Sequence, residues 1–131
     1  VLEIGTGSGY QAALLALLAK QVISIERIPE LAESARRVLQ DIGITNVEIH
    51  TGDGTLGYPP SAPYKAILVT AAAPAAPQVL LDQLADGGRL IIPAGQRDLQ
   101  QLQVWQRVSD RFEYEDILPV VFVPLLGEFG W

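Results

Sequence analysis

Two kinds of apolar pattern alternate along the first two thirds of the chain. Short runs rich in β-branched residues are typical of buried strands, and apolar residues three and four positions apart are typical of helices. The expected strands are residues 1–4, 21–26, 47–51, 65–70 and 89–93, and the expected helices are residues 11–20, 29–42 and 77–84. This alternation predicts a parallel sheet with right-handed crossovers, in which ligands bind at the carboxyl ends of the strands.

The last third of the chain has a different pattern. Residues 101–108 alternate between two sets of side chains, Ser109-Asp110 has the composition of a turn, and residues 112–125 are again extended in character. Two such runs around a turn are typical of an antiparallel hairpin. We therefore expect a hairpin that completes the sheet.

Two of the expected elements are apolar on nearly all sides. The helix at 11–20 has apolar residues over most of its circumference, which predicts that it packs on the sheet. The strand at 65–70 contains a continuous apolar run at 66–69, which predicts a parallel strand covered on both faces.

The first ten residues run from a strand directly into a glycine-rich turn. Gly5, Gly7 and Gly9 follow the strand at 1–4, and a helix is expected immediately afterwards. Glycine lets the backbone turn sharply and approach a ligand with no Cβ in the way, and the N–H groups at a helix start favour a carboxylate or phosphate. The stretch therefore predicts a cradle for a nucleotide-like cofactor.

Acidic residues follow the next two strands of the same sheet. Glu26 ends the second strand, and Asp53 lies in a Gly-Asp-Gly turn after the third. A dinucleotide-binding fold is the first alternative for these glycines and acids. Its fingerprint has the spacing G-x-G-x-x-G, whereas here Tyr10 takes the place of the third glycine. The arrangement suits S-adenosylmethionine, with its amino-acid end at the glycine turn, its ribose at Glu26 and its adenine at Asp53.

Each acid also has a purely structural interpretation. Glu3 can belong to a buried network, Glu26 can serve the start of the next helix, and Asp53 can form the turn beside its glycines. The agreement of all three positions within one sheet favours a binding role.

Composition narrows the class of protein. The chain has 131 residues, of which 49% are hydrophobic and 18% charged, as expected for one compact domain. A net charge of -6 and a pI near 4.6 argue against a nucleic-acid partner. No apolar run reaches the roughly 18 residues that span a bilayer. Because the sequence starts without Met inside a core strand, we expect it to be the C-terminal part of a longer protein.

Six blocks of the sequence resemble the protein-L-isoaspartate (D-aspartate) O-methyltransferase family. The first three are shared in looser form with many Rossmann-like methyltransferases, whereas the Thr-Ala-Ala-Ala-Pro and Val-Pro-Leu blocks narrow the resemblance to this family. The blocks are Leu2-Glu-Ile-Gly-Thr-Gly-Ser-Gly-Tyr10, Ile25-Glu-Arg27, Gly52-Asp-Gly54, Val69-Thr-Ala-Ala-Ala-Pro74, Gly88-Arg-Leu-Ile-Ile-Pro-Ala-Gly95 and Phe122-Val-Pro-Leu125.

The resemblance implies a fold and a function. The fold is α/β, a Rossmann-like class I methyltransferase with a mostly parallel, doubly wound sheet ending in an antiparallel hairpin. Residues 1–131 would form a single S-adenosylmethionine-binding domain that lacks the N-terminal region of the family. The implied enzyme is a cytoplasmic repair methyltransferase that acts on the α-carboxyl of L-isoaspartyl or D-aspartyl residues in damaged proteins. We expect a monomer with isoaspartyl peptides and proteins as partners, and with no nucleic acid, membrane or metal.

The resemblance also assigns roles to residues. Gly5, Gly7, Ser8 and Gly9 would hold the methionine part of the cofactor, Glu26 and Arg27 its ribose region, and Asp53 and Gly54 its adenine, with Glu3 as a further cofactor-binding residue. Thr70, Ala71 and Ala72 would line the isoaspartyl pocket, and Leu125 and Leu126 would close over the cofactor.

No catalytic residue is assigned within the chain. The family's substrate-contacting serine lies in the N-terminal region, which has no counterpart here, and Lys65 stands where the family usually has an acid. A carboxylate substrate is ionised at neutral pH, so its attack on a sulfonium needs no general base. His50 is therefore expected to be structural. Two alternatives stay open: another methyltransferase of the same fold, and a non-catalytic module that binds the cofactor or damaged chains.

Overall fold

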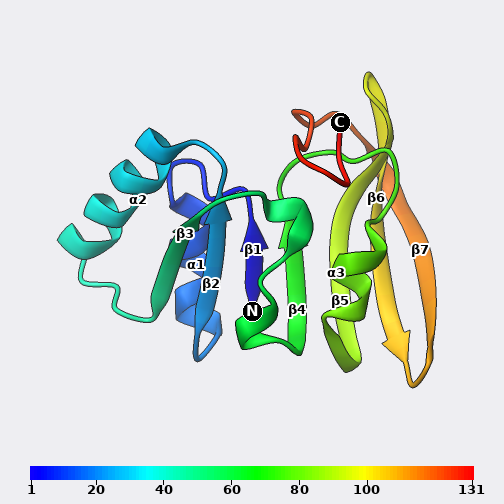
Figure 1. The fold of residues 1–131 in the computed structure, drawn as a ribbon, viewed down its shortest axis with the longest axis horizontal. Helices are drawn as coiled ribbons and strands as arrows, with labels where there is room; N and C mark the ends of the chain where they lie inside the picture. The colour runs from blue at the N-terminus through cyan, green and yellow to red at the C-terminus, as the bar shows by residue number, and fades with distance from the viewer.

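The structure, a computed structural model, describes residues 1–131 and contains one seven-stranded sheet in the order β3-β2-β1-β4-β5-β6-β7. Strands β1 to β5 are parallel, and β6 and β7 continue the sheet as an antiparallel hairpin (Figure 1). The strands are β1 Leu2–Ile4, β2 Val22–Glu26, β3 Val47–Thr51, β4 Tyr64–Val69, β5 Leu84–Gln96, β6 Leu99–Val108 and β7 Arg111–Val120. The predicted parallel sheet and closing hairpin are confirmed.

Three helices connect the parallel strands. They are α1 Tyr10–Leu18, α2 Pro29–Asp41 and α3 Gln78–Asp82, with two 3-10 turns at η1 Gly54–Leu56 and η2 Pro59–Ser61. Pro29 starts α2 because its fixed φ suits a first helical position, where no N–H is needed. Helices α1 and α2 pack against β2 and β3, and α3 packs against β5 and η1. None of these helices has the length and hydrophobicity of a membrane span.

The core follows from the two-residue period of the strands. Leu2 lies beside Ile23 on one side and Ile67 on the other, and Ile67 lies beside Leu90. These four side chains are buried in one cluster with those of α3. Because successive strand residues point to opposite faces, Glu3 and its register partners face the side of α1 and α2.

The last crossover is shorter than the sequence predicts. Helix α3 ends at Asp82 instead of Leu84, and β5 begins at Leu84 instead of Arg89. Leu84 pairs with Tyr64 of β4, and a Cβ on Gly88 would lie only 2.7 Å from the carbonyl oxygen of Tyr64. The close approach of the backbones keeps residues 84–88 along β4, so sheet pairing overrides the helical pattern at this end.

Helix α1 packs on the sheet as predicted, but most of its other sides are exposed, and the predicted coverage of both faces of β4 is wrong for this chain. In α1 only Ala12 is buried, and Leu17 and Leu18 are 78% and 86% exposed. In β4 Ile67 and Val69 are buried, whereas Ala66 and Leu68 on the other face are only half-buried. Helices α1 and α2 lie over β2 and β3 and leave that face of β4 without a helix (Figure 1).

The chain leaves the sheet after β7. Extended structure was predicted through residue 125, but β7 ends at Val120, and the last residues turn across the carboxyl ends of the strands (Figure 1). A parallel bridge between Ala72 and Pro124 fixes this segment beside the loop that follows β4.

Candidate active site

A cavity of about 380 Å³ opens at the carboxyl ends of the parallel strands. Five segments that are distant in sequence form its wall: the glycine turn, the end of β2 with the start of α2, the first residue of η1, the end of β4 and the C-terminal segment. The lining residues are Ile4, Gly5, Gly7, Ile25, Glu26, Arg27, Ile28, Leu31, Gly54, Thr70, Ala71, Val123, Pro124, Leu125 and Leu126. Seven of the predicted binding residues therefore meet in one place, together with Leu125 and Leu126.

The glycine turn needs glycine at each of its three positions. Gly5, Gly7 and Gly9 have φ of 95°, 54° and 87°, in the left-handed region that other residues avoid. A Cβ on Gly5 would collide with Oγ1 of Thr70, and one on Gly9 would lie 3.3 Å from Cβ of Ala35 in α2. The 5-7-9 spacing therefore reflects a sharp turn that packs against both β4 and α2.

Glu26 joins the end of β2 to the glycine turn. Its Oε2 accepts a 2.8 Å hydrogen bond from the N–H of Gly7, and its Oε1 accepts one of 3.0 Å from the N–H of Ile28. A carboxylate has about four acceptor positions, so two remain. Glu26 also lines the cavity, which makes these positions available to a ligand with hydroxyl donors.

Glu3 does not line the cavity and lies fully buried behind it. Its Oε1 accepts a 2.5 Å hydrogen bond from Oγ of Ser24, and the same hydroxyl lies 2.6 Å from Oγ1 of Thr6 in the glycine turn. Burial raises the pKa of Glu3, and the nearby charge of Glu26 adds to the effect while Ser24 opposes it. The network connects Glu3 to the turn through Ser24 and Thr6, without contact with the cavity.

Asp53 also lies outside the cavity wall, next to Gly54, which is part of it. Its Oδ1 accepts hydrogen bonds from the N–H and Oγ1 of Thr55 at 2.9 and 2.7 Å, and its Oδ2 accepts one of 2.9 Å from the N–H of Glu128. Burial opposes ionisation, but these bonds and the charge of Arg27 lower the pKa of Asp53 below its ordinary value. The carboxylate is therefore held ionised by contacts within the protein.

The residues that follow β4 form the part of the wall beside the glycine turn. Oγ1 of Thr70 donates to the carbonyl of Gly5 at 2.8 Å, which fixes the hydroxyl against the glycine turn. Ala71 lines the cavity, whereas Ala72 is buried beneath the C-terminal segment and bonds to Val123 and Leu125 through its backbone. Ser8 and Gly9 also lie outside the lining, and Ser8 is exposed.

Sequence reasoning missed most of the apolar lining. Ile4 ends β1, Ile25 is the last apolar residue of β2, and Ile28 and Leu31 lie just before and within the first turn of α2. An available signal was that the last apolar residue of each parallel strand adjoins the edge where ligands bind. The missed residues give the cavity apolar surfaces on either side of the carboxylate of Glu26.

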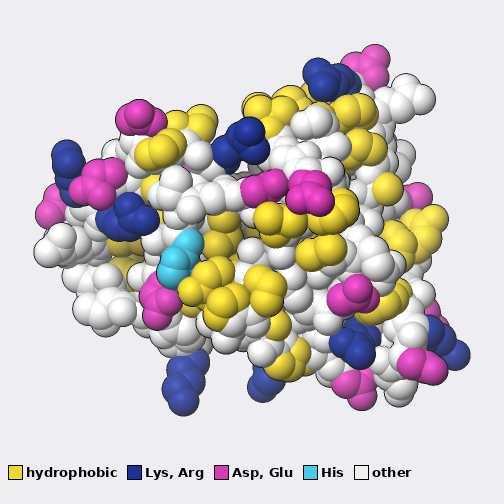
Figure 2. All heavy atoms as spheres, in the orientation of Figure 1, with side chains coloured by type: hydrophobic (Ala, Val, Ile, Leu, Met, Phe, Trp, Pro, Cys, Tyr) yellow, Lys and Arg dark blue, Asp and Glu magenta, His cyan; other side chains and the backbone are white.

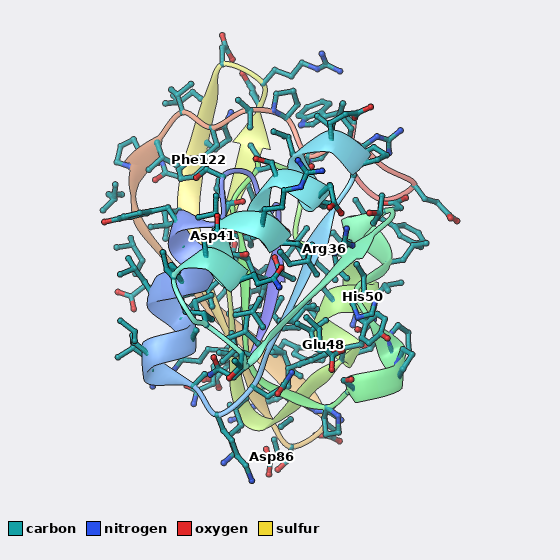
Figure 3. All side chains as sticks on the ribbon, turned by 90° about the vertical axis from the view of Figure 1, so that its left-hand side faces the viewer. Arg36, Asp41, Glu48, His50, Asp86 and Phe122 are labelled. Carbon is teal, nitrogen blue, oxygen red and sulfur yellow. The ribbon has the colours of Figure 1, made fainter.

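His50 lies away from the cavity, on the edge strand β3. Its ring stacks on Tyr58 with centroids 4.4 Å apart, and its Nε2 lies 3.3 Å from Oε2 of Glu48. Figure 3 shows His50 and Glu48 on β3, with Arg36 on the neighbouring α2, where Arg36 donates to the carbonyl of Ile49 at 2.8 Å. On the face seen in Figure 2, acidic and basic side chains are interspersed among apolar ones.

Known proteins match the chain along its whole length. The sequence model of the protein-L-isoaspartate(D-aspartate) O-methyltransferase family matches residues 1–130. The protein-L-isoaspartate O-methyltransferase of Methanoculleus marisnigri is 56% identical over 131 residues, which are 100% of this chain and 60% of that protein. The enzyme of the same name from Pyrococcus abyssi is 52% identical over 134 residues, covering 100% of this chain and 62% of the relative. The chain thus spans about 60% of the length of these curated relatives.

Solved structures agree with this match. A protein-L-isoaspartate O-methyltransferase superposes with a TM-score of 0.89 at 32% identity, over 98% of this chain and 42% of the other. A candidate enzyme of this kind from Plasmodium falciparum, in complex with S-adenosyl-L-homocysteine, superposes with a TM-score of 0.82 at 25% identity, over 95% of this chain and 64% of that one. The predicted Rossmann-like methyltransferase fold is confirmed, and with the match over residues 1–130 the chain belongs to the protein-L-isoaspartate(D-aspartate) O-methyltransferase family.

Proposed function

We propose that this chain is the S-adenosylmethionine-binding domain, residues 1–131, of a protein repair methyltransferase. The enzyme would transfer a methyl group to the α-carboxyl of L-isoaspartyl or D-aspartyl residues in damaged proteins. The observation that carries the proposal is the meeting of the glycine turn, Glu26, Gly54 and Thr70-Ala71 in one cavity. The family membership of the chain supports the choice of reaction and substrate.

The chemistry of the lining groups suits S-adenosylmethionine. Side chains on Gly5 and Gly54 would collide with Thr70 and Ile4, so the wall packs as it does only with glycine at both positions. The glycine turn, Gly5 to Gly9, would hold the methionine part, the free acceptor positions of Glu26 would take the ribose hydroxyls, and Arg27 would flank them. The apolar side chains of Ile4 and Ile28 provide surface for the remainder of the group.

The adenine end would lie near Gly54 and Asp53. Gly54 lines the cavity, whereas the carboxylate of Asp53 already accepts three hydrogen bonds from Thr55 and Glu128. About one acceptor position remains for an adenine amino group. Glu3 would support the cofactor indirectly, because its network with Ser24 and Thr6 ends in the glycine turn.

The loop Thr70-Ala71-Ala72 would present the substrate. When bound, S-adenosylmethionine supplies an electrophilic methyl group on its sulfonium, and an isoaspartyl carboxylate is ionised at neutral pH without a general base. The residues of the chain then contribute positioning and exclusion of water, which together can lower a barrier by roughly 7–11 kcal/mol. Leu125 and Leu126, which line the cavity from the C-terminal segment, would exclude water.

The proposal extends to partners and location. We place isoaspartyl-containing peptides and proteins as partners of a monomeric, cytoplasmic enzyme. The net charge of -6 supports the absence of a nucleic-acid partner. Cell fractionation and size-exclusion chromatography with light scattering test the location and the monomeric state.

Two measurements, made one after the other, test the proposed function. Calorimetry of S-adenosylmethionine with the 131-residue chain measures cofactor binding separately from turnover. Methyl transfer to an isoaspartyl peptide and to its ordinary aspartyl counterpart, with the chain alone and with a family N-terminal region fused before Val1, then measures the reaction. We expect labelling of the isoaspartyl peptide only, and much more with the fused region.

The outcomes separate the proposal from its alternatives. Equal labelling of both peptides would indicate another methyltransferase of the same fold. Binding without any labelling, even in the fused protein, would indicate a non-catalytic module, an alternative favoured by the fact that the chain spans only about 60% of its relatives. Absence of binding would contradict the cofactor assignment itself.

A further inference from the structure

The last nine residues, 123–131, form a segment that we name the C-terminal strap. Its first four residues, Val123 to Leu126, form one wall of the cavity, and the chain then turns back so that the N–H of Trp131 donates to the carbonyl of Leu125 at 2.8 Å. In Figure 1 the strap lies across the upper end of the sheet, close to the loop after β4. The strap therefore encloses one side of the cavity.

Three hydrogen bonds fasten the strap to the cofactor side of the cavity. The N–H of Glu128 donates to Oδ2 of Asp53 at 2.9 Å, and the N–H of Phe129 donates to Oγ1 of Thr55 at 3.2 Å. A guanidinium nitrogen of Arg27 donates to the carbonyl of Leu126 at 3.2 Å. The partners include Arg27 and Asp53, which are predicted to lie near the ribose and adenine of the cofactor, and Thr55 close to Asp53.

Gly127 brings the strap closer to Asp53 than any other residue would allow. A Cβ on Gly127 would overlap all three atoms of the Asp53 carboxyl group. The carboxylate also accepts both the N–H and the hydroxyl of Thr55, so it is fixed in place before the strap reaches it. Asp53 and Gly127 therefore make a fitted pair, in which the carboxylate occupies the space that a side chain would take.

We propose that Asp53 is a positioning residue that clasps the C-terminal strap, through the N–H of Glu128 and the bare backbone of Gly127, and so holds Leu125 and Leu126 over the cavity. Asp53 then controls how long a ligand stays bound through the strap, in addition to any contact with the adenine. The identity of the ligand rests on the proposed function, whereas the clasp itself does not.

The environment of Trp131 can show whether the strap is held in place, even when no ligand is bound. Its indole N–H donates to the carbonyl of Ala72 at 3.0 Å, and the guanidinium of Arg97 lies 4.8 Å from its ring centroid. The only other tryptophan is Trp105, so a Trp105→Phe background leaves Trp131 as the single indole fluorophore. Release of the strap would expose this indole to water and to a quencher such as acrylamide.

The first experiment measures acrylamide quenching of Trp131 in the ligand-free protein. We expect Asp53→Asn and Gly127→Ala each to increase quenching, since the first removes an acceptor for Glu128 and the second forces the strap away. Asp41→Asn and Gly43→Ala are matched controls: Asp41 is exposed, and Gly43 has a positive φ with no neighbour within 4 Å of a Cβ. Unchanged quenching in both clasp variants would overturn the proposal.

A double variant tests the fitted pair. Asp53→Ala removes the atoms that a Cβ on Gly127 would overlap, so Gly127→Ala should add little quenching in the Asp53→Ala background. Additive effects of the two substitutions would show that the residues act independently, which contradicts the clasp.

The second experiment measures the dissociation rate of S-adenosyl-L-homocysteine by stopped flow. We expect Asp53→Asn and Gly127→Ala each to increase this dissociation rate by about ten-fold, because each variant loses one hydrogen bond to a charged group. The association rate should change little. If only Asp53→Asn acts, Asp53 contacts the ligand directly and the clasp is overturned. If the unaltered protein does not bind this ligand at all, the proposed function fails, and the quenching experiment still decides the clasp.

Discussion

Oε2 of Glu26 accepts a 2.8 Å hydrogen bond from the backbone N–H of Gly7, nineteen residues earlier in the chain. The other oxygen accepts from the N–H of Ile28 at the start of the α2 segment. One carboxylate thus fixes the glycine turn and the entry to a helix while it lines the cavity. The structural and binding interpretations of this acid are compatible, because the two backbone bonds use only half of its acceptor positions.

The first prediction concerns Glu26. Replacement by Ala removes the ribose acceptor and both backbone bonds, so we expect the dissociation constant for S-adenosylmethionine to rise by about ten-fold or more. Glu26→Gln keeps one acceptor oxygen and should have a smaller effect. Calorimetry measures both, with Glu30→Ala, an exposed acid in the first turn of α2, as the control. Unchanged affinity in Glu26→Ala would refute the ribose assignment.

The second prediction concerns the collision between Gly5 and Thr70. Gly5→Ala adds a Cβ that overlaps Oγ1 of Thr70, whereas Gly43→Ala has a similar positive φ and no neighbour. We expect Gly43→Ala to lower the free energy of unfolding by about 1–2 kcal/mol through backbone strain alone. Gly5→Ala should cost clearly more, as measured by urea denaturation.

A second substitution tests the cause of that difference. Thr70→Ala removes Oγ1, and the nearest remaining side-chain atom, Cβ of residue 70, would lie 3.6 Å from the new methyl group. The double variant Gly5→Ala/Thr70→Ala should therefore be less destabilised than the sum of its two single variants. Strict additivity would mean that the collision is not what makes Gly5 necessary.

The sequence patterns predicted the parallel part of the fold because local signals and tertiary structure agree there. Helix α2 begins at Pro29 and ends before Gly43, as expected, and the β-branched residues of β2 and β3 lie in strands. Agreement fails where a contact distant in sequence decides the structure. Leu84 was expected in a helix but pairs with Tyr64, a constraint that no local pattern contains.

The site was predictable where backbone chemistry requires a particular residue type. The three glycines of the turn and Glu26 follow from the needs of a sharp turn and of a strand end. The lining by Val123 to Leu126 does not follow from any local pattern, because it depends on how the chain returns after β7. Glu3 shows the same limit, since its burial and its bond to Ser24 depend on the register between β1 and β2.

The third prediction concerns the exposed leucines of α1. Leu17 and Leu18 are 78% and 86% exposed, so Leu18→Gln should change the free energy of unfolding of this chain by less than about 0.5 kcal/mol. Leu80 in α3 is fully buried, and Leu80→Ala should cost about 2–5 kcal/mol. Urea denaturation of the 131-residue chain measures both. A large loss in Leu18→Gln would mean that α1 is covered in solution.

The fourth prediction concerns the pH dependence caused by Glu3. Burial raises the pKa of this carboxyl above its ordinary value of 4.5. In the window above 4.5 the folded protein therefore keeps a proton that the unfolded chain has released, and the free energy of unfolding must fall as the pH rises through that window. Each unit by which the pKa is raised corresponds to about 1.4 kcal/mol.

Glu3→Gln removes this proton and keeps an acceptor for Ser24, so its unfolding free energy should fall less between about pH 4 and about pH 8 than that of the unaltered chain. Urea denaturation at intervals across this range measures the two slopes. Glu30→Gln, an exposed acid, should leave the slope of the unaltered chain unchanged. If Glu3→Gln has the same slope as the unaltered chain, then Glu3 ionises in the folded protein at its ordinary pKa. Its buried network with Ser24 and Thr6 would then hold the charge without cost to stability.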